Sequence, residues 1–438
     1  MTTSPNRPSR RQLLSAYPLG AVALYALPAS RLPETAPSLQ HPGGTAEESA
    51  KDESFWRQVR SEFDLDSNRI TTNLAAGAYN APPRTVHAAF LRATEFINAM
   101  PGVNRSLAFG DGPREKLRTR LANTLGVSAD ELAFTRGTTE ALNIVSAGVQ
   151  LESGDEVLTT DLDYRSLRAA WRLRGLRDGV RLREVSVPAP PSSPTELVQI
   201  LADAFTPRTR LVHICHITGP NGQIFPVRDV CDMAHDRGAQ VVVDGALAYG
   251  VLPVDLSELG CDYYGTSLHK GIYAPSGTGL LYVRKGLVSD LLPLFGAHAP
   301  RSDDVRKFEE IGTSPVAPLA SVNAALDFHE RIGTDRVQAR LHFLKRTWME
   351  ILGDSPHVTF HTSPAPEQSC AIVNARIGDA DPYSVWRYLY DQHGTSCYYS
   401  TEPFQGVIVR FHIHTLRNDV ERCAHILRRI AKEGLPGK

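Results

Sequence analysis

The sequence has few residues of the kinds that form disulfide frameworks or metal sites. Its 438 residues include only six cysteines, at positions 215, 231, 261, 370, 397 and 423. These cysteines are too sparse and too scattered for a disulfide framework, and no two of them form a CxxC pair. We therefore expect neither structural disulfides nor a bound metal ion.

An excess of charge of either sign is also lacking. The chain has 47 Lys and Arg against 48 Asp and Glu, a formal net charge of -1. Such a balance argues against a nucleic acid or an anionic membrane as a partner held mainly by charge. Lysine itself is scarce, with eight residues at positions 51, 116, 270, 285, 307, 345, 432 and 438. Because a lysine amine can react covalently with a carbonyl group and an arginine cannot, these eight lysines are the candidates for such chemistry.

The first fifty residues have the layout of an export leader. Arg10-Arg11 stand just before Leu13-Leu14, and a mostly apolar run at 15–29 leads into a polar stretch that ends near Lys51. This layout is typical of export signals, and the paired arginines resemble a twin-arginine signal. We expect residues 1–50 to be a signal and linker, the twin-arginine translocase to be a partner, and the location to be periplasmic or otherwise exported. The alternative is a disordered tail with a chance apolar run.

After residue 51, helical and strand-like segments alternate without an internal repeat. Strand-like runs occur at 132–134, 156–159, 181–185, 211–215, 241–243 and 279–283. The alternation predicts an α/β fold with a mostly parallel, doubly wound sheet. From about Ala317, a long helical stretch and further strands predict a smaller α+β domain. The expected division is 51–315 for a large domain and 316–438 for a small C-terminal domain.

Two candidate sites lie where expected strands end. Gly137-Thr138-Thr139 begin a helical segment, and the free N–H groups of a helix N-terminus can bind a phosphate with help from the two hydroxyls. Asp244 ends the apolar run at 240–243, and ligands of open α/β sheets bind at the carboxyl ends of strands. Taken singly, each has an ordinary alternative: a helix cap for the first and a turn cap for the second.

The third candidate is Lys270, which stands among uncharged neighbours in the sequence SLHKGIY at 267–273. Such a setting lowers the pKa of a lysine and makes its amine a nucleophile toward a carbonyl, whereas a solvated surface lysine is the usual alternative. Pyridoxal 5'-phosphate (PLP) needs a phosphate seat, a carboxylate at its ring nitrogen and a lysine for a Schiff base. Because the Gly137 loop, Asp244 and Lys270 supply all three, the sequence predicts a PLP site.

These motifs resemble those of the class V aminotransferases, which are fold type I PLP enzymes. The resemblance runs from about Asn73 to Asp419 and lies in RGTTE at 136–140, VDGA at 243–246, SLHK at 267–270 and FEEIGT at 308–313. It implies a sheet of the seven-stranded type in the large domain. It also implies that the chain is an enzyme of the aminotransferase class V or isopenicillin N epimerase-like type.

The resemblance implies a role for each motif in binding PLP. Asp244 pairs with the pyridine nitrogen, and Lys270 forms the Schiff base. Tyr164 occupies the place of the usual ring-stacking histidine and can stack equally well, so it joins these two as a catalytic candidate. The candidate phosphate ligands are Gly137, Thr138, Thr139, Ser267 and His269.

The resemblance also implies a substrate site and a homodimer. Arg410 matches the arginine that binds the α-carboxylate of the substrate through a bidentate contact. Asn73 lies where the family places a loop that faces the substrate. Gly312 and Thr313 match a loop that reaches the phosphate in the neighbouring subunit. We therefore expect a homodimer that acts on a small amino-acid or peptide-like substrate.

The sequence departs from the family pattern at the groups that usually bind the O3′ atom of PLP. Leu247 stands where the family commonly has Gln or His, and Gly219 stands where desulfurases have Asn. Leucine cannot donate a hydrogen bond, so His216 or Thr218 is expected to substitute. The pattern is closer to the isopenicillin N epimerase-like branch than to the cysteine desulfurases. With its leader, the chain is also similar to the exported PLP enzymes of pyoverdine maturation.

A cysteine desulfurase needs a cysteine on a mobile loop shortly before the arginine that binds the carboxylate. Cys397 precedes Arg410 by thirteen residues but lies in a strand-like run. A small buried hydrophobic residue is its expected role, which disfavours persulfide chemistry. The spacing of His412 and His414 suits one face of a strand, but the sequence offers no third ligand for a metal, so we expect them to be core residues or residues that support the site from outside it.

The expected reaction begins when Lys270 removes a proton from the Cα of an amino acid or of an amino-acid moiety in a natural product. Transamination, epimerisation and β-elimination all remain open. Epimerisation also needs an acid on the opposite face, where Tyr164 or His216 could serve. The alternatives are a C–S lyase or desulfurase-like enzyme and an exported PLP-fold protein that only binds a ligand. A Rossmann oxidoreductase is disfavoured because no GxGxxG follows an early strand.

Overall fold

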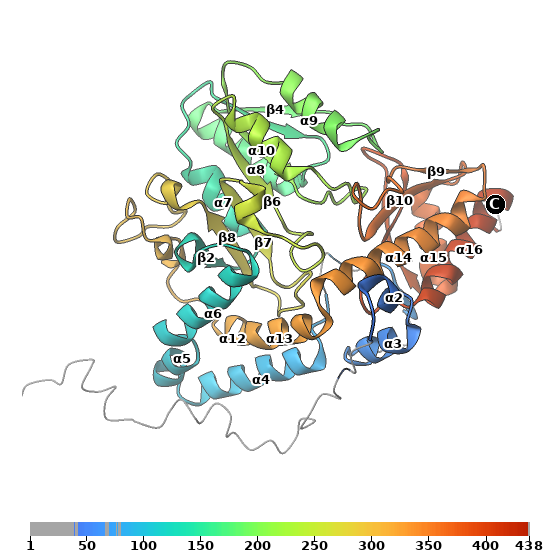
Figure 1. The fold of residues 1–438 in the computed structure, drawn as a ribbon, viewed down its shortest axis with the longest axis horizontal. Helices are drawn as coiled ribbons and strands as arrows, with labels where there is room; N and C mark the ends of the chain where they lie inside the picture. Colours follow the sequence, from blue (N-terminus) through green and yellow to red (C-terminus); the bar gives the residue numbers. More distant parts are fainter. Residues whose placement is uncertain (1–38, 40–42, 66–69, 76, 78–79, 437–438) are drawn as a thin grey trace, which may run out of the picture.

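The computed structural model describes residues 39, 43–65, 70–75, 77 and 80–436 (Figure 1). Most of the expected export leader, residues 1–38 and 40–42, lies outside the described residues. Within the expected linker, the short helix α2 (Ala46–Ala50) is capped by Thr45, whose side chain accepts a hydrogen bond from the Glu48 amide. None of the helices in the described ranges is long and apolar enough to cross a membrane.

A sheet of seven strands forms the centre of the molecule, in the order β2-β8-β7-β6-β5-β3-β4. The strands are β2 (Leu132–Thr135), β3 (Glu156–Thr160), β4 (Arg181–Val185), β5 (Thr209–Cys215), β6 (Gln240–Asp244), β7 (Tyr263–Ser267) and β8 (Gly279–Val283). Only β8 runs antiparallel to its two neighbours. The expected α/β fold with a mostly parallel sheet is confirmed.

Apolar side chains on both faces hold this sheet between helices. Consecutive residues of a strand point to opposite faces, so Val242 of β6 packs in one core while Val241 and Val243 pack in the other. The first core contains α7 (Thr138–Gly148) and α8 (Arg165–Asp178), and the second contains α10 (Val227–His235). Burial on both faces explains why these strands are continuous apolar runs in the sequence.

The C-terminal part is an antiparallel sheet covered by helices. Its strands are β9 (Val358–Phe360), β10 (Ile372–Ile377), β12 (Tyr398–Ser400) and β13 (Gly406–Arg410), in the order β12-β13-β10-β9. Its helices are α13 (Val322–Ile332), α14 (Thr334–Gly353), α15 (Pro382–His393) and α16 (Arg417–Glu433). Helices α14 and α16 pack along each other (Figure 1).

The first described residues lie against this C-terminal part. Helix α2 packs on α14, and α3 (Glu53–Ser61) lies beside α2 (Figure 1). The two-residue strand β1 (Thr72–Asn73) pairs in parallel with β11 (Thr395–Ser396). The chain therefore contacts the C-terminal part through α2, α3 and β1 before it enters the central sheet.

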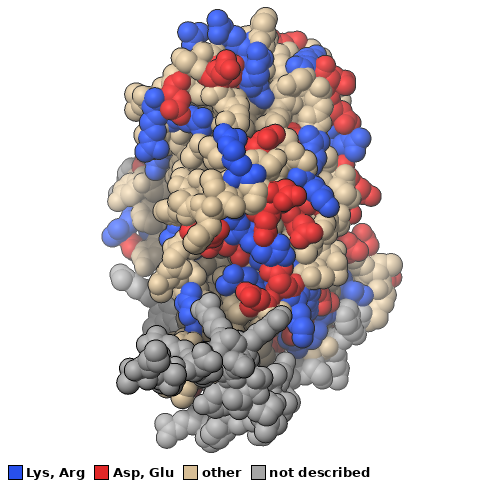
Figure 2. Space-filling view, turned by 90° about the vertical axis from the view of Figure 1, so that its left-hand side faces the viewer, with Lys and Arg blue, Asp and Glu red and all other residues tan. Residues whose placement is uncertain are grey.

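The remaining elements surround the sheet. They are α4 (Arg84–Ala99), α5 (Pro101–Phe109), α6 (Asp111–Thr124), α9 (Pro194–Asp203), α11 (Leu256–Leu259), α12 (Ala317–Ala320), η2 (Ala129–Glu131), η3 (Lys285–Leu287) and η4 (Val305–Glu309). Figure 2 shows one face of the molecule, on which acidic and basic side chains are interspersed. This mixture agrees with the formal net charge of -1.

Candidate functional site

The first part of the site is the turn between β2 and α7. Helix α7 begins at Thr138, whose amide donates a hydrogen bond to Ser267 Oγ at 2.9 Å. The Thr138 and Ser267 hydroxyl oxygens lie 2.7 Å apart. Any Cβ at Gly137 would lie 3.3 Å from Ser267 Oγ, and one at Gly279 would lie 2.5 Å from the Gly137 Cα. The glycines thus let the backbone and two hydroxyls gather at the N-terminus of α7, a favourable place for a phosphate.

Asp244 and Lys270 lie at the same edge of the sheet because Asp244 ends β6 and Lys270 follows the carboxyl end of the neighbouring strand β7. Asp244 is the last residue of β6, and its Oδ1 accepts a hydrogen bond from the Ala246 amide at 2.9 Å. Burial raises the pKa of Asp244, and the charge of Lys270 opposes that shift. Burial likewise lowers the pKa of Lys270, while Asp244 opposes it. Burial thus favours the neutral form of each group, and the charge of the other group opposes that effect.

The turn that carries Lys270 is held by contacts from distant parts of the chain. Asn80 Nδ2 donates to the Lys270 carbonyl oxygen at 2.8 Å. Gly271 packs so closely that a Cβ there would lie 2.2 Å from the carbonyl oxygen of Tyr249. Tyr273 adopts a φ of 64°, which is unusual for a side chain with a Cβ. Sequence reasoning missed Asn80, because nothing in its local sequence connects it with a lysine 190 residues away.

Tyr164 lies on the mouth of the site at the start of α8, and its side chain is 55 % exposed. The preceding residue, Asp163, is buried and holds this turn in place. Its Oδ2 accepts hydrogen bonds from Thr159 Oγ1 and from the amide and hydroxyl of Thr160, each at 2.8 Å. Its Oδ1 accepts from the Cys215 amide at 2.5 Å. Asp163 therefore fixes the Tyr164 turn against β5.

Arg410 approaches from the C-terminal sheet, where it ends β13. Its Nη2 donates to the Gly219 carbonyl oxygen at 3.2 Å, and its guanidinium carbon lies 4.8 Å from the ring centroid of Tyr398. Burial lowers the pKa of Arg410. Its Nε is buried without a hydrogen-bond partner among the described residues. This unfilled donor makes Arg410 able to bind an additional oxygen acceptor such as a carboxylate.

Most of the residues selected from the sequence line one cavity of 1320 Å³. Those residues are Gly137, Thr138, Thr139, Tyr164, Asp244, Ser267, His269, Lys270 and Arg410. Leu247 also lines the cavity, so an apolar side chain stands where the family commonly has a hydrogen-bond donor. The cavity thus brings together predicted residues from the central sheet and from the C-terminal sheet.

His216, Thr218 and Asn73 do not line this cavity. His216 is buried, its Nδ1 lies 3.2 Å from Tyr264 Oη, and burial lowers its pKa to about 4. The Thr218 hydroxyl donates to Asn221 Oδ1 at 2.6 Å. The Asn73 side chain accepts a hydrogen bond from the Ala75 amide at 3.0 Å. These three side chains thus bond within the protein, and none of them is among the residues that line the cavity.

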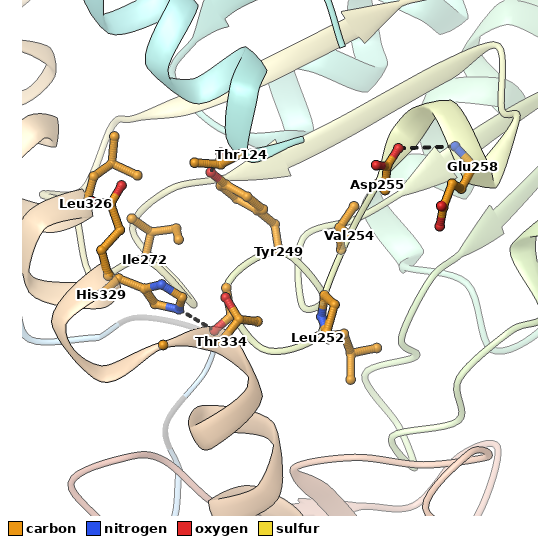
Figure 3. A pocket seen from close by; sticks show the side chains of 14 residues that line it. Thr124, Tyr249, Leu252, Val254, Asp255, Glu258, Ile272, Leu326, His329 and Thr334 are labelled. Carbon is orange, nitrogen blue, oxygen red and sulfur yellow. Dashed lines mark hydrogen bonds between the residues drawn. The ribbon is translucent and has the colours of Figure 1, made fainter. Parts of the chain in front are cut away.

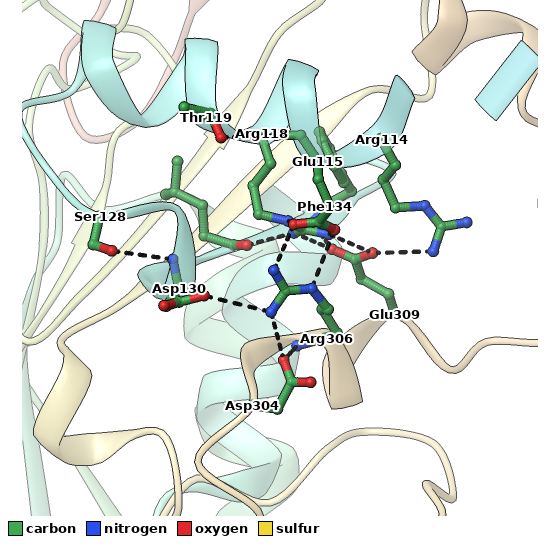
Figure 4. Close-up of polar contacts among 11 residues, drawn as sticks. Arg114, Glu115, Arg118, Thr119, Ser128, Asp130, Phe134, Asp304, Arg306 and Glu309 are labelled. Atoms are coloured by element: carbon green, nitrogen blue, oxygen red, sulfur yellow. Dashed lines mark hydrogen bonds and ion pairs between the residues drawn. The ribbon is translucent and has the colours of Figure 1, made fainter. Parts of the chain in front are cut away.

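Gly312 and Thr313 are exposed and lie outside the cavity of their own chain. The motif that contains them is anchored by a network of charged residues (Figure 4). Arg118 Nη1 contacts Glu309 Oε1 at 2.5 Å, and the same oxygen accepts a hydrogen bond from the Phe134 amide at 2.8 Å. Because Phe134 lies in β2 just before the Gly137 turn, Glu309 joins this motif to the strand that leads into the phosphate seat.

A second cavity of 460 Å³ lies between α13 and the turn after β6 (Figure 3). Its buried polar groups are satisfied by protein partners. Tyr249 Oη lies 2.6 Å from Thr124 Oγ1, and His329 Nε2 lies 2.9 Å from the Gly250 carbonyl oxygen. These contacts connect α6 and α13 to the turn at Tyr249 and Gly250, which packs against Gly271. They therefore help to fix the neighbouring residue, Lys270.

All six cysteines are among the described residues, and all are buried and free. Burial raises the pKa of the Cys397 thiol, and the Cys397 carbonyl oxygen accepts a hydrogen bond from Trp386 Nε1 at 3.0 Å. Cys397 is therefore a buried core residue, as expected. Cys215 is the cysteine that lines the large cavity, and burial raises its thiol pKa as well. No group of three or more His, Cys, Asp or Glu in the described ranges could hold a metal ion.

The residues of the large cavity fit PLP. The turn at Gly137 and the hydroxyl groups of Thr138 and Ser267 at the N-terminus of α7 would hold the phosphate. The buried Asp244 would hold the ring nitrogen. Lys270 supplies an amine, and Tyr164 supplies an aromatic ring at the opening of the cavity. All of these residues line the same cavity.

Comparison with known proteins agrees with this geometry. The family model for class V aminotransferases matches residues 112–422. Isopenicillin N epimerase from Streptomyces clavuligerus is 29% identical over 393 residues, which cover 85% of this chain and 97% of that protein. A cysteine desulfurase from Salmonella agona (strain SL483) is 32% identical over 286 residues, which cover 61% of this chain and 67% of that protein.

The fold is shared with solved structures as well. The apo structure of a cysteine desulfurase from Thermococcus onnurineus NA1 has a TM-score of 0.75 at 23% identity, and the match covers 86% of this chain and 98% of that one. The similarity to the epimerase spans almost the whole of that relative, which supports the expected epimerase-like branch. The chain belongs to the class V aminotransferase family, and its cofactor is PLP.

Proposed function

We propose that this protein is an enzyme that removes the Cα proton of an amino acid, or of an amino-acid moiety in a larger molecule, as aminotransferases and epimerases do. One observation carries the proposal: the amine of Lys270, the carboxylate of Asp244 and the guanidinium of Arg410 open onto one cavity. The same cavity includes the N-terminus of α7, where a phosphate can bind.

Each of these residues has a task that follows from its surroundings. When bound, PLP supplies an electron-withdrawing ring that stabilises negative charge at the Cα of the substrate. Asp244 is buried at the end of β6, and its carboxyl group would hold a proton on the ring nitrogen. Burial lowers the pKa of Lys270, which favours the neutral amine that can accept the Cα proton. Arg410 would bind the α-carboxylate with its unfilled donor.

The place to which the proton returns decides between the two reaction types. Transamination needs only Lys270 as the proton carrier, whereas epimerisation needs a second group that delivers a proton to the other face of the Cα. Of the two residues considered for this task, Tyr164 lines the cavity and His216 does not. We therefore propose Tyr164 as the second group if the enzyme is an epimerase.

A desulfurase-like activity is less well supported. Persulfide chemistry requires a thiolate that can reach the substrate, and burial raises the pKa of both Cys397 and Cys215. Cys215 is also fixed in β5 through its amide, which donates to Asp163. C–S lyase activity needs no such cysteine, so it stays an outcome of the experiment below.

We also propose that the enzyme is an exported homodimer. The exposure of Gly312 and Thr313, outside the cavity of their own chain, supports a role at a neighbouring subunit. The arginine pair and apolar run at 10–29 support export through the twin-arginine translocase into the periplasm.

The experiment is reconstitution of the purified protein with PLP, followed by borohydride reduction and peptide mapping. We expect a yellow protein that loses its colour on reduction and yields a pyridoxyl-modified peptide containing Lys270. The Lys270→Arg variant should not be labelled, and the control Lys285→Arg should be labelled like the wild type. A colourless reconstituted protein, or label on another lysine, would sink the proposal.

The reaction type is then read in deuterated water with a panel of amino acids. Cα deuteration with inversion identifies an epimerase, and conversion of the cofactor to pyridoxamine 5'-phosphate identifies an aminotransferase. Release of pyruvate identifies a lyase, and release of sulfide with alanine identifies a desulfurase. Either of the last two results would replace the proposed reaction type.

A further inference from the structure

A few residues that follow β1 contact the backbones of both Arg410 and Lys270. We call these residues the tether: Leu74, Ala75, Gly77 and Asn80. Leu74 is fully buried, and its carbonyl oxygen accepts a hydrogen bond from the Arg410 amide at 2.8 Å. Ala75 continues this pairing as a parallel bridge with Arg410. The first end of the tether is therefore fixed to the residue that ends β13.

Asn80 joins the other end of the tether to the turn that carries Lys270. Its Oδ1 accepts a hydrogen bond from the Gly77 amide at 2.9 Å, and its Nδ2 donates to the Lys270 carbonyl oxygen at 2.8 Å. The same carbonyl oxygen also accepts from the Tyr273 amide at 3.3 Å, but that bond stays within the turn. The side chain of Asn80 is therefore the group through which the tether holds the Lys270 turn.

The tether runs next to the wall of the large cavity. Gly77 has a φ of 98°, a region that favours glycine. A Cβ at this position would lie 3.9 Å from Arg410 Cδ and 4.0 Å from Leu247 Cδ2. Arg410 and Leu247 both line the cavity, as Lys270 does. The tether thus connects two cavity residues by a route that passes beside the cavity.

An amino acid that reacts in this cavity must meet Arg410 and Lys270 at the same time. Its α-carboxylate and its Cα proton are held close together by covalent bonds, so the guanidinium and the amine have to keep a matching separation. Arg410 belongs to the C-terminal sheet, whereas Lys270 follows a strand of the central sheet. Because packed elements can slide past each other by small shear movements, a contact that joins the two residues has a direct effect on this separation.

We infer that Asn80 is a positioning residue that fixes the separation between the Lys270 amine and the Arg410 guanidinium. This inference rests on the proposed function, which assigns the Cα proton to Lys270 and the α-carboxylate to Arg410. If Asn80 only stabilised the fold, its loss would affect every reaction at the Lys270 turn to the same extent. If it sets the separation, its loss selectively affects molecules that bind Arg410 as well.

The test compares two probes on the PLP-loaded enzyme: aminooxyacetate and methoxyamine. Both carry the same aminooxy group, which reacts with PLP, and only aminooxyacetate carries a carboxylate that Arg410 can bind. The reaction is followed by the absorbance of the bound cofactor. Each second-order rate constant is divided by the rate constant of the same probe with free PLP, which removes differences in intrinsic reactivity.

The ratio of the two normalised rate constants, aminooxyacetate over methoxyamine, is the carboxylate preference. We expect a preference of about tenfold in the wild type, because the arginine contact is charge-assisted. In Asn80→Ala we expect the preference to fall by about fivefold while the rate constant of methoxyamine stays within about twofold of the wild type. Asn80→Leu fills a similar space without either hydrogen bond and should behave like Asn80→Ala.

Asn104→Ala is the matched control. Asn104 Nδ2 also donates to a backbone carbonyl oxygen, that of Phe96, at 2.6 Å, but Asn104 lies in α5 and does not line the cavity. This control should keep the full carboxylate preference. Urea denaturation of the PLP-free variants shows the stability that each one loses. If Asn80→Ala is too unstable to purify, Asn80→Leu decides.

Arg410→Leu separates the failure of this inference from the failure of the proposed function. A wild type without a carboxylate preference, or a preference that persists in Arg410→Leu, overturns both. A preference that is lost in Arg410→Leu but unchanged in the two Asn80 variants overturns the inference alone. Rate constants that fall equally for both probes in those variants show that Asn80 only stabilises the fold, which also overturns the inference.

Discussion

At the scale of single residues, one buried hydrogen bond joins the turn of Lys270 to the segment that follows Arg410. Tyr273 Oη and His412 Nδ1 lie 3.0 Å apart, and the two ring centroids are 4.6 Å apart. Tyr273→Phe keeps the ring and removes the hydroxyl, which leaves a buried nitrogen without its partner. We expect the free energy of unfolding to fall by about 1–3 kcal/mol, measured by urea denaturation.

The control for this prediction is a double-mutant cycle. His412→Phe and the double variant are measured beside Tyr273→Phe. Because the two groups bond to each other, the double variant should lose less stability than the sum of the two single losses. Strictly additive losses would show that the hydroxyl and the imidazole act independently.

The site residues that could be predicted from the sequence share a property. Asp244 and Lys270 follow the carboxyl ends of strands, and neighbouring strands of a parallel sheet bring such residues together whatever their surroundings. The direction in which a buried side chain points could not be predicted from the sequence. His216 turns toward Tyr264 of a strand two places along the chain, and Asn80 bonds the backbone of Lys270 from 190 residues away. No local pattern contains either contact.

At the scale of elements, the ion pair of Glu309 with Arg118 holds η4 against β2 and α6 (Figure 4). The Arg118 side chain is fully buried, so removing the charge of Glu309 leaves this cation with one carboxylate partner, Glu115, instead of two. We expect Glu309→Gln to lower the free energy of unfolding by about 1–3 kcal/mol. We also expect weaker binding of PLP, measured by equilibrium dialysis, because Phe134 leads into the Gly137 turn.

The same network supplies the control for Glu309→Gln. Asp304 contacts Arg306 at 2.9 Å, but its side chain is 52 % exposed. Asp304→Asn should therefore cost less than about 1 kcal/mol and leave PLP binding unchanged. Equal losses for the two variants would mean that burial does not set the strength of this network.

The strands of the central sheet could be predicted because burial on both faces makes them continuous apolar runs. The pairing of β1 with β11 could not. Each of these strands has two residues, which is too short for any periodicity, and they pair across more than 300 positions of the chain. The contacts of Glu309 with Arg118 and Phe134 could not be predicted either, because nothing in the local sequence distinguishes Glu309 from any other acidic residue beside a turn.

At the scale of the whole molecule, the order of the elements follows from the sequence but the route of the first described segment does not. Helices α2 and α3 lie against the C-terminal helices, and Arg340 of α14 donates to the Ala50 carbonyl oxygen at 2.8 Å. Helical periodicity predicts that an amphipathic helix buries one face. It does not say against which part of the chain the face packs, because any apolar surface of the right shape satisfies it.

The whole molecule also carries several buried neutral histidines that make its stability depend on pH. Burial lowers the pKa of His216 to about 4 and that of His414 to about 3, and it lowers the pKa of His412 well below its ordinary value. Below the ordinary value of 6.5, these residues take up protons in the unfolded chain but stay neutral in the folded one. The unfolded state then binds more protons, so the free energy of unfolding falls as the pH falls from 6.5 toward 4.

We expect the Tm, measured by differential scanning calorimetry, to be nearly constant above pH 7 and to drop steeply between pH 6.5 and 4.5. His216 and His414 should each contribute a loss of about 2 kcal/mol over that interval. Carboxylates act at lower pH, since Glu115, with a pKa lowered to about 2, loses its contribution only below its ordinary value of 4.5. A Tm that stays level from pH 7 to 4.5 would show that these histidines are solvated in the folded protein, and the interior that surrounds Lys270 and Arg410 would then be more open than the structure has it.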